Sequence, residues 1–104
     1  MWSADENGLL GAWHELEPGT AMSVKVGDIT VDVFRQTHGW HLMIPLENAT
    51  FSPQLLGQVE QHFPDYHLLL LHERCYLQRR YAELTAQIIL DIHALAGGLS
   101  AWSY

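Results

Sequence analysis

Residues 66–96 read YHLLLLHERCYLQRRYAELTAQIILDIHALA, with no glycine or proline before the pair Gly97-Gly98. From residue 70 onward the apolar side chains follow steps typical of one stripe of a helix. They are Leu70, Leu77, Tyr81, Leu84, Ile88, Ile92 and Leu95. The pattern predicts one long C-terminal helix that ends at the two glycines. Because such a helix is longer than the rest of a small domain, part of its apolar stripe is expected to contact another chain.

The beginning of this stretch has two interpretations. Residues 66–72 hold four consecutive leucines between His67 and His72. A continuous apolar run of this length fits either the first turns of the long helix or a fourth, buried strand. The helix is the preferred interpretation, and the strand stays open.

The chain before this stretch contains a β region. Residues 22–26 alternate apolar and polar side chains, the period of a half-buried strand. Gly27-Asp28 is a two-residue turn with glycine first, which is typical of a tight hairpin. Residues 29–36 are rich in β-branched side chains and form the second predicted strand, with Ile29, Val31 and Val33 on one face.

A second turn, Thr37-His38-Gly39, places glycine where a positive φ is expected. The third strand is predicted from Trp40 to Ile44, and Pro45 is expected to end its ladder. Ser52-Pro53 then begins a short helix, with serine as the N-cap. The predicted fold is therefore α+β, a three-stranded antiparallel meander covered by a short helix and a long C-terminal helix.

The length of 104 residues predicts a single domain, 1–104. Within it, residues 1–19 form a candidate acidic amphipathic arm that docks on the sheet, residues 22–45 the β meander, and residues 53–96 the helical part.

Charge narrows the classes of partner. Twelve acidic residues against five basic ones give a formal net charge of −7. Neutralising a nucleic-acid backbone needs clustered lysine and arginine, so a nucleic-acid partner is not expected. A single cysteine fits a reducing compartment. The start of the chain lacks the features of a secretory signal, and no apolar run is long enough for a membrane span. These features predict a cytoplasmic protein without a membrane partner.

Two pairs of side chains are the candidates for chemistry. His38 and His41 flank a predicted turn, and His72 and Cys75 are three residues apart. A zinc site needs three or four ligands, and the sequence has no CxxC, HExxH or HxH pattern. A catalytic cysteine is usually found in an electropositive, partly exposed place, whereas Cys75 lies in an apolar run. We therefore expect no enzyme activity, no metal and no cofactor.

The aromatic content indicates protein contact instead. Tryptophan and tyrosine are concentrated in interface cores because they bury a large area at low entropic cost. The candidate partner-binding residues combine two tryptophan anchors with the predicted helix stripe: Trp13, Trp40, Leu77, Tyr81, Leu84 and Ile88.

The predicted order is a short N-terminal helix, three strands with Gly27-Asp28 at the first turn, a helix opened by Ser52-Pro53, and a C-terminal helix. This order, the small size and the acidity resemble the small acidic chaperones of type III secretion systems. Those chaperones have a helix, three strands, a helix, two more strands and a final helix. Chaperone-like regulators of the same gene clusters, such as the negative regulator of the Hrp system in plant pathogens, are similar. The sequence departs from the pattern in lacking a clear second pair of strands, unless YHLLLL is one.

The resemblance implies a non-enzymatic binding module, a chaperone-like or anti-activator regulator of virulence functions. Its partner would be a chaperone-like protein, an effector or a transcription activator, and a homodimer stays open. An alternative is an acidic immunity protein that neutralises a basic toxin through Asp5, Glu6, Glu15 and Glu17. A third hypothesis is a small enzyme or metal protein that uses His38, His41, His72 or Cys75.

Overall fold

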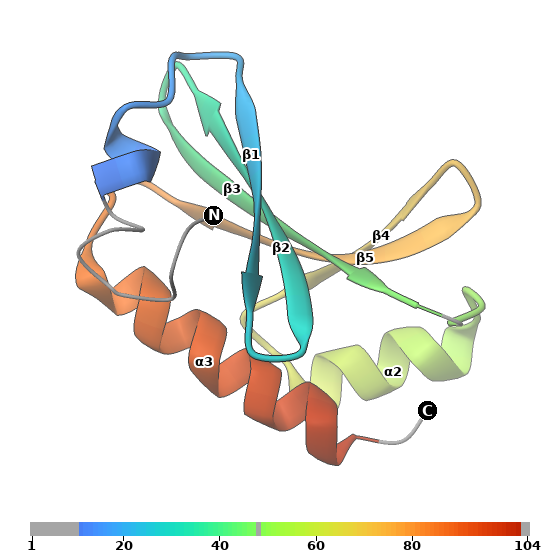
Figure 1. Cartoon of the computed structure of the whole chain (residues 1–104). Helices are drawn as coiled ribbons and strands as arrows, with labels where there is room; N and C mark the ends of the chain where they lie inside the picture. The colour runs from blue at the N-terminus through green and yellow to red at the C-terminus, as the bar shows by residue number, and fades with distance from the viewer. Residues whose placement is uncertain (1–10, 48, 103–104) are drawn as a thin grey trace.

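The computed structural model describes residues 11–47 and 49–102, which form an α+β domain. Five antiparallel strands make one sheet in the order β1-β2-β3-β5-β4. Two helices, α2 and α3, lie together on one side of this sheet (Figure 1). The elements are β1 (Ala21–Val26), β2 (Ile29–Gln36), β3 (Gly39–Leu46), α2 (Pro53–His62), β4 (His67–Leu71), β5 (Arg74–Tyr81) and α3 (Ala86–Ala101).

The meander of the first three strands is confirmed. In β1 and β2 the buried positions alternate with exposed or half-buried ones, as the period-2 pattern predicts. The turns between the strands use glycine at positive φ, +61° at Gly27 and +108° at Gly39. Val24 pairs with Val31 and faces the helices, so the valine face of the meander forms the centre of the core.

The predicted end of the third strand at Pro45 is wrong, because β3 continues to Leu46. The register explains why proline is tolerated there. The pairing of β2 with β3 extends only to Met43, whereas the pairing of β3 with β5 continues to Leu46. Pro45 therefore has a paired neighbour on one side only, and a residue without an N–H group is acceptable at such a position.

The prediction of one helix over residues 66–96 is also wrong, and so is the assignment of 53–96 as a helical part. Residues 67–81 form the hairpin of β4 and β5, and helix α3 begins only at Ala86. The turn of the hairpin is His72-Glu73, with φ of +49° and +65°. Tight hairpin turns of this kind usually contain asparagine or glycine, so no turn signal is present at His72-Glu73.

Both helices pack their apolar sides against the sheet. In α2 the Ser52 side chain accepts a hydrogen bond from the Leu55 N–H at 3.1 Å, which confirms the predicted N-cap. In α3 the fully buried side chains are Ile88, Ile89 and Ile92. The predicted stop at Gly97-Gly98 is wrong, since α3 continues to Ala101. A Cβ on Gly98 would lie 3.0 Å from the Phe63 ring, so glycine allows α3 to approach this ring closely.

The described part of the predicted N-terminal arm is docked on the domain. Residues 11–14 are helical, and Trp13 is completely buried in the core. The guanidinium of Arg35 donates hydrogen bonds to the carbonyl oxygens of His14 and Leu16, and it lies 5.3 Å from the centre of the Trp40 ring. Residues 1–10, which include Asp5 and Glu6, lie outside the described residues.

Candidate partner-binding surface

The sheet has a second face, which points away from α2 and α3. We call it the open face, because no described helix packs on it. The register puts apolar side chains from three strands side by side there, because Pro45 pairs with Tyr76 and Tyr76 with Leu69. On β2, Phe34 pairs with His41. Phe34 and Leu71 are 36% and 44% exposed. The apolar open-face residues are Phe34, Met43, Pro45, Leu69, Leu71 and Tyr76.

A buried histidine lies in the middle of the open face. His41 is only 9% exposed and stands in one row with Phe34 and Arg80. The amide nitrogens of Gln36 and Gln78 both lie 3.3 Å from its Nδ1. An amide N–H donates, so these two contacts fit a neutral ring in which Nδ1 accepts. Burial, and then the charge of Arg80, lower the pKa of His41 below its ordinary value.

This environment predicts a pH dependence of stability. As the pH falls below the ordinary value of 6.5, the unfolded chain binds a proton at His41 that the folded chain does not, so the free energy of unfolding decreases. The free energy of unfolding stops decreasing below the pKa of His41 in the folded chain, because both states then bind the proton. Urea unfolding between about pH 7.5 and about pH 5.5 measures it. His41→Gln is expected to reduce the change of the free energy of unfolding with pH. His38→Gln is the control, because His38 lies in an exposed turn, and it is expected to leave this change as it is in the unmodified chain. Equal slopes in all three proteins would contradict the assignment.

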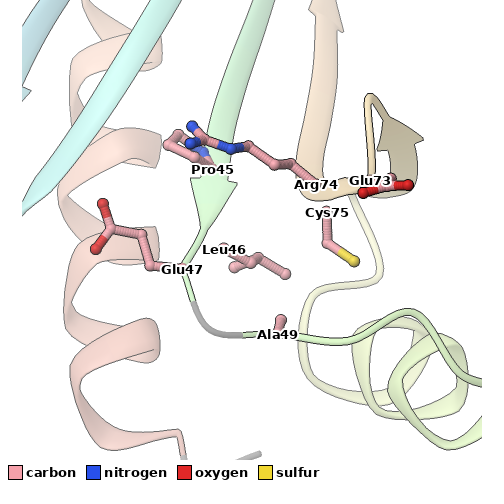
Figure 2. A pocket seen from close by; sticks show the side chains of 7 residues that line it. All are labelled: Pro45, Leu46, Glu47, Ala49, Glu73, Arg74 and Cys75. Atoms are coloured by element: carbon pink, nitrogen blue, oxygen red, sulfur yellow. The ribbon is translucent and has the colours of Figure 1, made fainter.

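A notch lies beside the open face, where β3 ends next to the β4–β5 hairpin (Figure 2). Its volume is about 360 Å³. Pro45, Leu46, Glu47 and Ala49 come from the chain that leaves β3, and Glu73, Arg74 and Cys75 come from the hairpin. In Figure 2 the Arg74 side chain extends toward Pro45, while Glu47 and Glu73 lie on opposite sides of the notch. The notch is thus lined by apolar side chains together with an arginine and two glutamates.

A second arginine has a structural role. The guanidinium of Arg79 lies 5.4 Å from the Tyr66 ring centre and 4.9 Å from that of Tyr81. It also forms an ion pair with Asp91 of α3 at 3.5 Å. The Tyr81 hydroxyl donates to the same carboxylate at 2.8 Å, and burial together with this bond raises the pKa of Tyr81. This cluster holds α3 against β5 and leaves Arg79 engaged within the domain.

The predicted partner-binding residues divide into two groups. Trp13, Trp40, Leu77 and Ile88 are buried in the core, where they pack against other residues of this chain. Tyr81 and Leu84 are half-buried and pack against the edge of that core. The structure therefore does not bring the six side chains together on one surface. The helical periodicity of the predicted stripe reflects burial of its side chains within the domain.

The two members of each predicted chemical pair lie in different environments. His38 lies in an exposed turn, whereas His41 lies on the open face. His72 is exposed at the hairpin turn, and Cys75 is buried on the helix side of β5. Within residues 11–47 and 49–102, no group of three histidine, cysteine, aspartate or glutamate side chains is placed to hold a metal ion.

Sequence reasoning missed the open-face residues. The signal was present as a period of two: Arg74, Tyr76, Gln78 and Arg80 alternate with Cys75, Leu77, Arg79 and Tyr81. The helical stripe uses Leu77 and Tyr81 as well, because two residues four apart satisfy both periods. Only the alternation assigns Tyr76 to a different face from Leu77.

Comparisons with known proteins do not assign this chain to a class. No protein-family model matches the chain, and no curated protein or solved structure matches it significantly. Among the described residues, neither helix has the length and apolar character needed to cross a membrane.

Proposed function

We propose that this chain is a non-enzymatic protein-binding module, a chaperone-like or anti-activator regulator of a bacterial type III secretion system that works in the cytoplasm. The observation that carries the proposal is the open face of the sheet. Its apolar side chains come from four neighbouring strands, and among them Phe34 and Leu71 are exposed. Grouped exposed apolar side chains of this kind mark protein contact sites.

The composition of this face supports a protein partner over a small molecule. Tyr76, Met43 and Phe34 are residue types that are enriched in interface cores, and Arg74 and Arg80 stand at the rim. The hollow beside this face is the notch of about 360 Å³ at the end of β3. A sheet face with exposed apolar side chains and arginines fits another polypeptide.

The order of elements supports the choice of class. Helical residues 11–14 are followed by three strands, a helix, two strands and a final helix. This order resembles that of the type III secretion chaperones, with β4 and β5 as the second pair of strands. The partner would then be an effector, a transcription activator or a second chaperone-like protein.

The experiment is affinity co-purification of the tagged protein from its native host, with mass and stoichiometry of what elutes. The double variant Phe34→Asp and Leu71→Asp places charge on two exposed open-face positions, so we expect it to lose a stoichiometric partner. Leu90→Asp is the control, since Leu90 is 53% exposed on α3, on the other side of the molecule. Circular dichroism confirms that both proteins are folded. A folded double variant that retains the partner would contradict the proposal.

A further inference from the structure

A hollow of about 250 Å³ lies on the helix side of the molecule, where the end of α2 meets the second half of α3 (Figure 1). It adjoins a depression of about 400 Å³, because His62, Phe63 and Gly98 line both. Trp102 lines the depression, and its ring lies in a T-shaped arrangement with that of Phe63, with 5.1 Å between the ring centres. We call the hollow and the depression together the α2–α3 trough.

The hydroxyl of Tyr66 is the group in this trough that the domain itself does not use. The Tyr66 side chain lines the hollow and is only 8% exposed. Its hydroxyl is buried and has no hydrogen-bond partner in the described part of the chain, although buried polar groups are nearly always paired. Burial raises the pKa of Tyr66, and the guanidinium of Arg79 opposes this rise. The hydroxyl therefore keeps its proton and can donate it to an acceptor.

Arg79 supplies further donors beside this hydroxyl. Its guanidinium lines the same hollow, 5.4 Å from the centre of the Tyr66 ring, and its ion pair with Asp91 spans 3.5 Å. The Asp91 carboxylate also accepts hydrogen bonds from Tyr81 at 2.8 Å and from Gln87 at 2.9 Å, so both of its oxygens are engaged. One ion pair engages only part of the N–H groups of a guanidinium. The hollow is thus richer in donors than in acceptors, which suits a ligand carboxylate.

The charge balance of the hollow sets a second requirement. Asp65 also lines the hollow and is exposed. Because Asp91 offsets the charge of Arg79, the carboxylate of Asp65 leaves the hollow with a net negative charge. A simple carboxylic acid would add a second negative charge next to it. A ligand that carries both a carboxylate and an ammonium group complements both signs.

We propose that the α2–α3 trough binds a free aromatic amino acid. The carboxylate of the ligand would lie at the Tyr66 hydroxyl and the Arg79 guanidinium, and its ammonium group at Asp65. Its ring would lie beside Phe63 and Trp102, since aromatic rings favour offset or edge-to-face contacts. This inference goes beyond the proposed function, because the trough is on the helix side of the sheet and the open face is on the other.

Calorimetry of the full chain with L-phenylalanine tests the ligand class. We expect L-phenylalanine to bind. Phenethylamine, which lacks the carboxylate, and 3-phenylpropionate, which lacks the ammonium group, should each bind at least about tenfold more weakly, because each leaves charged groups of the site unpaired. Two-dimensional NMR should show shifts in residues 62–66 and 91–98, with those of the open face unchanged.

Tyr66→Phe tests the residue that carries the argument. The variant should bind L-phenylalanine at least about fivefold more weakly, because it lacks one hydrogen bond to the carboxylate. Its urea unfolding should show no loss of stability, since the hydroxyl forms no hydrogen bond within the described residues. His93→Gln is the control, because His93 is exposed on α3 outside the trough, and it should bind as the unmodified chain does.

Several results would overturn the inference. They are no binding of L-phenylalanine, equal binding of phenethylamine, and unchanged binding by Tyr66→Phe. Tighter binding of an N-acetylated dipeptide that ends in phenylalanine would also overturn it, because the trough would then take the C-terminus of a chain. The proposed function is tested separately, at Phe34 and Leu71 of the open face, so either proposal can fail without the other.

Discussion

Replacing Ile88 by alanine is expected to lower the free energy of unfolding by about 2–5 kcal/mol. Ile88 is completely buried where α3 packs on the sheet, and the smaller side chain leaves a cavity that close packing cannot fill. Urea unfolding followed by circular dichroism measures the change. The same measurement decides whether Ile88 belongs to the core or to an exposed helix stripe.

Leu90→Ala is the matched control in the same helix. Leu90 lies two residues further along α3 and is 53% exposed, so its loss should cost less than about 0.5 kcal/mol. If the two substitutions had equally small effects, α3 would not pack on the sheet as described. An Ile88→Ala protein of unchanged stability that no longer binds a partner would restore the helix stripe as a contact surface.

Gly39→Ala is expected to destabilise the fold by about 2–4 kcal/mol. Gly39 has φ of +108°, a conformation that residues with a Cβ rarely adopt. In addition, an added Cβ would lie 2.6 Å from the carbonyl oxygen of Tyr81. This atom belongs to the backbone where β5 ends, so it can move only if the sheet itself shifts. Thermal and urea unfolding of the variant measure the loss.

Gly27→Ala separates the two causes. Gly27 also has a positive φ, +61°, but an added Cβ would meet only the Ala96 side chain at an ordinary 3.9 Å. Backbone strain alone should therefore cost about 1 kcal/mol. A loss at Gly39 no larger than the loss at Gly27 would show that the close approach to Tyr81 is absent.

The part of the fold with local signals could be predicted from the sequence. Gly27-Asp28 and Gly39 mark the two turns of the meander, alternation marks the strands, and Ser52-Pro53 marks the start of α2. Each of these signals comes from residues that are neighbours in the chain, and each survives in the folded domain because tertiary packing agrees with it.

The second half of the sheet could not be predicted in the same way. His72-Glu73 turns the chain at positive φ without glycine or asparagine, so nothing local separates β4 from β5. Leu77 lies in a strand and Ile88 in a helix, yet both are core residues and together they imitate a single helical stripe. The misassigned helix led to core residues being selected as the contact surface. The open face follows only from the cross-strand register, which no single segment of sequence contains.

The central claim is that the open face of the sheet contacts the partner protein. Hydroxyl-radical footprinting of the native complex, compared with the free chain, tests it most directly because it reports on individual side chains. We expect protection of Phe34, Met43, Tyr76 and Leu71, with Leu56 and Leu90 on the two helices labelled as strongly as before. Protection of Leu56 and Leu90 with the open face still labelled would contradict the claim.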